Sequence, residues 1–78
     1  MKVKMYSSPL CPYCAMAKVF LKKNGVKFED VNVQEDRKAA IEMINKTGQN
    51  GVPVIEVDGQ IIIGFDRKKL VEVLGLER

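Results

Sequence analysis

The chain has 78 residues, of which 46% are hydrophobic and 6% aromatic, a size and composition typical of a single globular domain over residues 1–78. Its 13 basic and 10 acidic residues leave a net charge of +3, and because both signs are spread along the chain we expect no nucleic-acid-binding face. No apolar run approaches the ~18 residues that cross a membrane, and residues 1–8 lack the apolar stretch of a signal peptide, so we expect a cytoplasmic protein.

The first part of the chain predicts a strand and then a helix. Residues 2–6 alternate in hydrophobicity, which indicates a strand with one buried face. Pro12 suits the first turn of a helix, because its missing N–H would have no partner there, and Asn24-Gly25 supplies a left-handed end. One face of the expected helix gathers Ala17, Phe20 and Leu21, with Met16 and Val19 beside it.

A second strand and a second helix are expected next. Residues 26–33 indicate the strand, and residues 35–48 predict the helix. The apolar side of this helix is expected to hold Ala40, Ile41 and Ile44.

The last part of the chain predicts a hairpin and a short helix. Two β-rich runs, residues 52–57 and 60–64, flank Asp58-Gly59, a pair typical of a two-residue turn. Residues 66–75 predict the helix, with Asp66 as its cap. The order is therefore β-α-β-α-β-β-α, an α/β fold with a four-stranded mixed sheet flanked by three helices. Its first strand–helix–strand unit should be parallel with a right-handed crossover.

The only two cysteines, Cys11 and Cys14, lie three positions apart, between the first strand and the first helix. A structural disulfide between them would close almost no loop and would stabilise little. A structural zinc site commonly takes four cysteine or histidine ligands, and one cysteine pair without any histidine cannot complete such a site alone. We therefore assign no metal ligand, although a site shared between two copies stays open.

A dithiol that does chemistry is the third possibility. Helix N-termini present unpaired N–H groups and a partial positive charge, which favour a thiolate over a thiol. Cys11, at or before the first turn, gains most from this effect, whereas Cys14 lies one turn further and nearer the core. We therefore expect Cys11 to attack a target disulfide and Cys14 to resolve the mixed disulfide that forms.

Residues beyond the cysteine pair match a known family. Over residues 3–74 the chain resembles the glutaredoxins and glutaredoxin-like redoxins. The features that carry the resemblance are CPYC before a helix, the later Val-Pro pair, the hairpin, and Gly64-Phe65-Asp66. The resemblance implies a thioredoxin-like fold and a thiol–disulfide oxidoreductase acting on protein disulfides or glutathione mixed disulfides. The resemblance implies glutathione as the cosubstrate and glutathione reductase as the enzyme that regenerates it. We also expect a monomer without a bound prosthetic group.

The resemblance also assigns roles to individual residues. Cys11 matches the family's nucleophile and Cys14 its resolving thiol. The other matching positions are Tyr13 beside the substrate, Val52 and Pro53 as the pair joined by a cis bond, and Gly64, Phe65 and Asp66 in the loop that holds the γ-glutamyl end of glutathione. Plainer roles stay open, since Pro53 could merely open a strand, Asp66 could only cap a helix and Phe65 could pack in the core.

Three positions depart from the glutathione-using members and leave the electron donor open. Ser8 stands where those members carry lysine, Gly51 where they often carry threonine, and Ile63-Gly64-Phe65 where a second glycine is usual. A Gly-Phe pair is closer to the small redoxins that donate electrons to ribonucleotide reductase and are recharged by thioredoxin reductase. An iron–sulfur or metal carrier using Cys11 at a dimer interface is an alternative of a different class.

Overall fold

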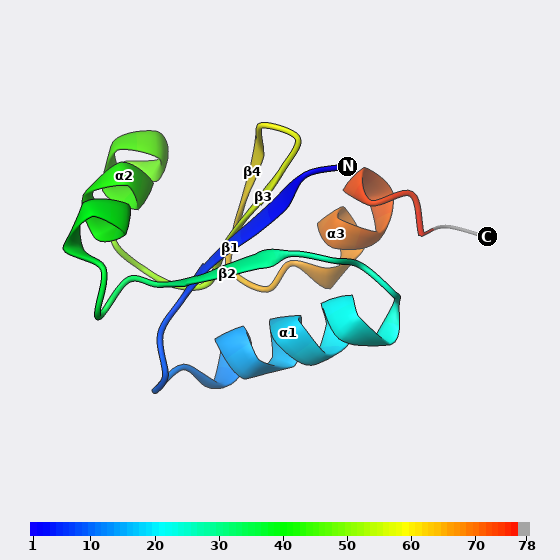
Figure 1. The fold of residues 1–78 in the computed structure, drawn as a ribbon. Coiled ribbons are helices and arrows are strands. Elements are labelled where there is room, and N and C mark those ends of the chain that lie inside the picture. Colours follow the sequence, from blue (N-terminus) through cyan, green and yellow to red (C-terminus); the bar gives the residue numbers. More distant parts are fainter. Residues whose placement is uncertain (77–78) are drawn as a thin grey trace.

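A computed structural model describes residues 1–76, and every element expected from the sequence is present in it. The elements are β1 (Val3–Ser7), α1 (Pro12–Lys23), β2 (Glu29–Asn32), α2 (Arg37–Thr47), β3 (Val54–Val57), β4 (Gln60–Ile63) and α3 (Arg67–Val73) (Figure 1). Most are shorter than predicted, because loop residues at both ends of a periodic run share its hydrophobicity without its hydrogen bonds. Within residues 1–76, no helix has the length and apolar character that crossing a membrane requires.

The four strands form one mixed sheet in the order β2-β1-β3-β4. β1 pairs in parallel with β2 and antiparallel with β3, and β3 pairs antiparallel with β4. The parallel pair needs a long crossover, which α1 supplies, whereas β3 and β4 need only a tight turn. Asp58 and Gly59 make that turn with φ angles of 47° and 90°, the positive values that the predicted hairpin requires.

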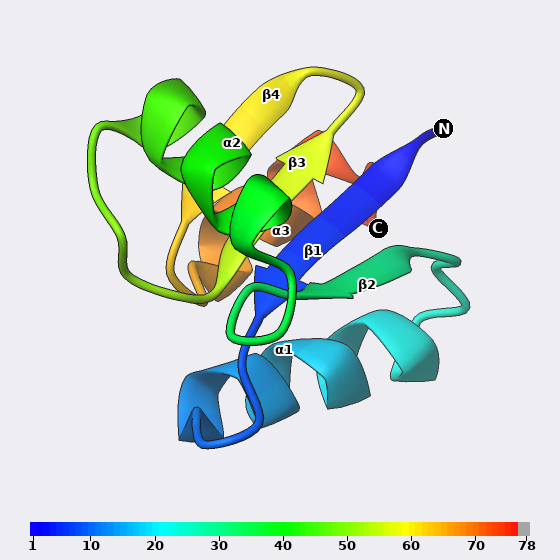
Figure 2. The same cartoon turned by 60° about the vertical axis from the view of Figure 1, so that its left-hand side comes forward.

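The helices cover both faces of the sheet, with α1 and α3 on one face and α2 on the other (Figures 1 and 2). Along β1 and β3 the side chains alternate between these two faces. Met5 and Ile55 pack with α1 and α3, whereas Tyr6 and Val54 pack with α2. The expectation that β1 buries one face is therefore wrong, since α2 fully buries Tyr6 on the second face.

The larger cluster lies between the sheet and the pair α1 and α3, and we call it the α1/α3 core. Its buried members are Val3, Met5, Cys14, Ala17, Leu21, Ile55, Val57, Ile62, Leu70 and Leu74. One of the two cysteines is thus part of the apolar core, which ties the position of the redox pair to the packing of α1.

The buried side of α2 differs from the one expected. Ala39 and Met43 pack against Tyr6 and Val54, while Ile41 and Ile44 are 51% and 42% exposed. The Asp36 side chain caps the helix by accepting from the N–H of Ala39 (3.0 Å). This cap and the fit over Tyr6 fix the rotation of α2, so the expected apolar side at positions 40, 41 and 44 is wrong.

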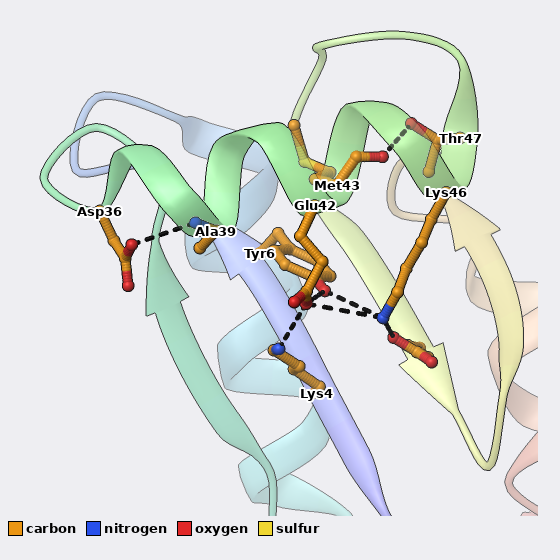
Figure 3. Close-up of polar contacts among 9 residues, drawn as sticks. Lys4, Tyr6, Asp36, Ala39, Glu42, Met43, Lys46 and Thr47 are labelled. Carbon is orange, nitrogen blue, oxygen red and sulfur yellow. Dashed lines mark hydrogen bonds and ion pairs between the residues drawn. The ribbon is translucent and has the colours of Figure 1, made fainter.

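Polar side chains surround the Tyr6 hydroxyl beneath α2, and Figure 3 shows Glu42 and Lys46 reaching toward it. Tyr6 donates to Glu42, which also accepts from Lys4 Nζ (2.8 Å). Lys46 Nζ donates to the Tyr6 oxygen (3.3 Å) and to Glu56 (2.9 Å). We call these five side chains the Tyr6 network. The hydrogen bond from Lys4, which has the largest effect, and the one from Tyr6 lower the pKa of Glu42 to about 2.

Candidate active site

The N-terminus of α1 is built around Cys11. Its backbone is extended (φ −135°, ψ 101°), and Pro12 follows as the first helical residue, the position where proline is tolerated best. The N–H of Cys14 donates to Cys11 Sγ at 3.1 Å, so the sulfur occupies the place of an N-cap oxygen. No acidic residue lies in the first turn of α1. This sulfur therefore faces helix N–H groups and no adjacent carboxylate from that turn.

The two cysteines form a disulfide in the structure, with Cα atoms 5.2 Å apart. Cys14 is 1% exposed and belongs to the α1/α3 core, whereas Cys11 is only half-buried at the edge of that core. A reagent in solution therefore reaches the sulfur of Cys11 more easily than that of Cys14. One helical turn separates the two cysteines and places their sulfurs within bonding distance.

The loop before β3 lies against the sulfur of Cys11, the more accessible of the two. The Val52–Pro53 peptide bond is cis, as the family resemblance predicted. The carbonyl oxygen of Val52 lies 3.7 Å from Cys11 Sγ, and Pro53 is buried beneath it. Residues separated by about half the chain thus meet at the reactive atom.

The loop between β4 and α3 is attached to this same place. The N–H of Gly64 donates to the carbonyl of Pro53 at 2.8 Å, with Gly64 at a φ of 80° that favours glycine. Phe65 follows and packs edge-on against Phe20, with ring centroids 5.8 Å apart. Asp66 Oδ1 accepts from the N–H of Lys69 (3.1 Å), so Asp66 caps α3. The packing and capping roles considered for these residues are both present in the structure.

The outer side of α1 is more apolar than a solvated helix face. Tyr13 is exposed beside the cysteines, as expected. Met16 and Val19, expected to lie beside the packing face, are instead 51% and 64% exposed. Their exposure could not be read from the sequence, because helical spacing alone places them close to the buried stripe.

A polar contact beneath α1 was missed by sequence reasoning. Asp30 on β2 pairs with Lys18 of α1 (2.7 Å) and accepts from the buried hydroxyl of Ser7 (2.6 Å). Partial burial acts to raise the pKa of Asp30, but the hydrogen bonds from Lys18 and Ser7 outweigh it and the pKa is lowered. The contact joins α1 to the edge strand, and no local motif in the sequence announces it.

The arrangement suits thiol–disulfide exchange. An accessible sulfur at a helix start can be held as a thiolate, and a second sulfur within bonding distance can displace whatever becomes attached to the first. Tyr13, Val52, Phe65 and Asp66 lie on the segments that border the pair. None of these side chains is a histidine, and the polar group that contacts Cys11 Sγ from α1 is the N–H of Cys14.

Comparison with known proteins identifies the family. A model of the glutaredoxin family matches residues 3–62. A glutaredoxin-like 8.6 kDa protein from the rubredoxin operon of Clostridium pasteurianum is 43% identical over 92% of this chain and 96% of its own length. Glutaredoxin 3 of Escherichia coli is 38% identical over 82% of this chain and 77% of its own length.

A solved structure agrees with these sequence matches. A mutant of the thioredoxin-like protein BC3987 superposes with a TM-score of 0.92 at 33% identity over 97% of both chains. The fold is therefore thioredoxin-like, as expected. The chain belongs to the glutaredoxin family and is a thiol–disulfide oxidoreductase with a CxxC pair at the start of α1.

Proposed function

We propose that the protein reduces protein disulfides and glutathione mixed disulfides through Cys11 and Cys14, with glutathione restoring the dithiol. It acts in the cytoplasm, as a monomer and without a resident prosthetic group. The observation that carries the proposal is the unequal placement of the two sulfurs: Cys11 is accessible and accepts from a helix N–H, while Cys14 is buried within bonding distance.

The first step is an attack on the target disulfide. The Cys11 thiolate bonds to one sulfur of the target, the target S–S bond breaks, and the other sulfur leaves as a thiolate. The helix N–H that donates to Cys11 Sγ supports the thiolate before attack. The carbonyl of Val52, 3.7 Å away, lies where the backbone of a bound substrate would pass.

Cys14 carries out the second step. Its thiol passes a proton to the departing thiolate and bonds to Cys11, so the substrate leaves as a thiol and the pair is left as the disulfide found in the structure. Two glutathione thiols then reduce this disulfide in two exchanges and leave as glutathione disulfide. Tyr13 and the loop Gly64 to Asp66 are the proposed contacts for glutathione, with the Asp66 carboxylate as partner of its ammonium group.

Serine substitutions test the two sulfur roles. Cys11→Ser should abolish reduction of every disulfide, because no thiolate remains to attack. Cys14→Ser should retain glutathione-dependent removal of glutathione from a mixed disulfide, which needs only Cys11, and should lose dithiol turnover. Both are measured as NADPH consumption in coupled assays. Turnover that survives in Cys11→Ser would contradict the role given to Cys11.

A specific observation supports a second electron donor. Phe65 packs its ring against Phe20, so the loop before α3 is apolar beside α1, and its Gly64-Phe65 pair resembles that of the small redoxins. The alternative is a redoxin that is recharged by thioredoxin reductase and donates electrons to ribonucleotide reductase. Comparing NADPH oxidation with glutathione plus glutathione reductase against thioredoxin reductase alone separates the two. Reduction by thioredoxin reductase without glutathione would replace glutathione as the proposed donor.

A further inference from the structure

An open groove of about 590 Å³ lies between the outer side of α1 and the start of α3. The residues that matter here are the apolar Met16, Val19, Phe20 and Phe65, and the cationic Lys23 and Arg67. Met16 and Val19 are large apolar side chains left half-exposed or more on a helix. Neighbouring apolar side chains exposed together in a groove are a common feature of interaction sites.

The walls of the groove are held in place by packing. Phe20 and Phe65 contact edge to face, with 63° between their planes. The guanidinium of Arg67 lies 5.5 Å from the centre of the Phe20 ring. Two aromatic rings and a cation thus pack together in the wall of the groove.

The charge of the groove has one sign. Lys23 and Arg67 are its only charged lining residues among those described, and neither forms an ion pair within residues 1–76. A partner that supplies carboxylates is therefore favoured over one that supplies cations. The same fact argues against a second copy of this chain, because a symmetric contact would place these cations against each other.

A stripe of side chains on α1 leads from the groove to the redox centre. Tyr13, Met16, Phe20 and Lys23 follow one another at helical spacings of three and four, so they form one stripe along α1. The stripe begins beside Cys11 and runs for ~15 Å along the helix axis at 1.5 Å per residue. An extended peptide covers that length in about five residues.

From this continuity and this charge we propose that the groove binds the segment of a protein substrate next to the cysteine under attack. It selects a segment with apolar residues near that cysteine and an Asp or Glu about five residues away. The apolar residues lie on Met16 and Val19, and the carboxylate reaches Lys23 or Arg67. The inference rests on the proposed reduction of protein disulfides and adds the class of segment recognised.

Synthetic peptides test the selectivity. Each peptide carries one cysteine, joined to a second copy as a disulfide, and four leucines followed by either glutamate or lysine, which therefore lies five residues from the cysteine. The glutamate and lysine peptides are made in two versions, with the leucines and the charged residue either after or before the cysteine, so that both chain directions along the groove are tested. We expect kcat/KM for the glutamate peptide to exceed that for the lysine peptide by about tenfold in one direction. Hydroxyethyl disulfide, too small to reach the groove, is the reference substrate.

Matched variants assign the effect to the groove. Lys23→Glu should remove or invert the preference for glutamate, and Val19→Glu should weaken both peptides. Both should leave the hydroxyethyl disulfide rate unchanged, which also reports that the variants fold. Lys38→Glu and Ile41→Glu, exposed on α2 on the far face of the sheet, make the same chemical changes and should alter nothing. Equal rates for both peptides in both directions, or equal effects of the α2 variants, would overturn the proposal.

A binding measurement separates this inference from the proposed reaction. A fluorescent glutamate peptide with serine in place of cysteine is titrated with the Cys11→Ser variant and followed by anisotropy. Binding that is weakened by Lys23→Glu supports the groove even if no disulfide is reduced, in which case only the proposed reaction fails. Absence of binding, or a protein dimer by sedimentation that Val19→Glu dissolves, counts against a substrate segment as the occupant.

Discussion

The two faces of the sheet are held together by different interactions. Under α1 and α3 the contacts are mainly apolar, and Leu21, Ile55 and Leu70 are fully buried around Cys14. Under α2 the apolar cluster is smaller, and the Tyr6 network supplies charged hydrogen bonds around a buried hydroxyl.

The difference follows what each face does. The face with α1 carries a sulfur that changes between thiol, thiolate and disulfide, and apolar neighbours do not compete for its protons or hydrogen bonds. The face with α2 holds no reacting group among those described, so ionised side chains can contribute to stability there without affecting chemistry. Among residues 1–76, most ion pairs therefore belong to the Tyr6 network on the face opposite the redox pair, and the pair Lys18–Asp30 is the exception.

The largest effect should come from truncating each core. Leu21→Ala removes a fully buried side chain from the α1/α3 core and should lower the free energy of unfolding by about 3–5 kcal/mol. Met43→Ala should cost about 2–3 kcal/mol, because the smaller cluster beside solvent can collapse into the space. Urea denaturation of both variants in the disulfide form measures these values. A larger loss for Met43→Ala than for Leu21→Ala would contradict the expectation that truncating the α1/α3 core costs more stability than truncating the cluster under α2.

Tyr6→Phe isolates the polar contribution of the α2 face. The ring remains buried while the hydroxyl that donates to Glu42 and accepts from Lys46 is removed. We expect a loss of about 1 kcal/mol, the usual net contribution of a hydrogen bond, and no change in disulfide reduction. Thermal unfolding and the NADPH-coupled rate are measured on the same preparation. A reduced rate at unchanged stability would show that the two faces are coupled.

The smallest effect concerns acid pH. The pKa of Glu42 is lowered from 4.5 to about 2, first by Lys4 and then by Tyr6, so its stabilising contribution is complete above 4.5 and is lost as pH falls through 2. Glu42→Gln should therefore lose less stability than the wild type between pH 4.5 and 2. Urea midpoints at several pH values in this range give the two slopes. Parallel slopes would mean that Glu42 is not held as a carboxylate by its neighbours.

Local signals in the sequence predicted most of the fold and the centre of the site. The Asp58-Gly59 turn, the cap at Asp66 and the start of α1 at Pro12 each depend on neighbours in the chain, and all are present. The cis bond at Pro53 came from the family resemblance and is also present.

The rotation of α2 and the burial of Tyr6 could not be predicted in the same way. Ile41 and Ile44 are more hydrophobic than Ala39, yet Ala39 faces the sheet because a small side chain lets the helix approach Val54 and Tyr6. That choice depends on contacts of Ala39 with residues 15 and 33 positions away in the chain, Val54 and Tyr6. The groove on α1 was missed for a similar reason, since Phe65 and Arg67, which complete it, come from the far end of the chain.

The hydrogen bond from Gly64 to Pro53 has a consequence for how such proteins diversify. It joins the loop before β3 to the loop before α3 through backbone atoms alone, so the side chains of Val52, Phe65 and Asp66 can be exchanged without separating these two loops. Substitutions at these positions can therefore change what the two loops contact without moving the cis peptide bond away from Cys11.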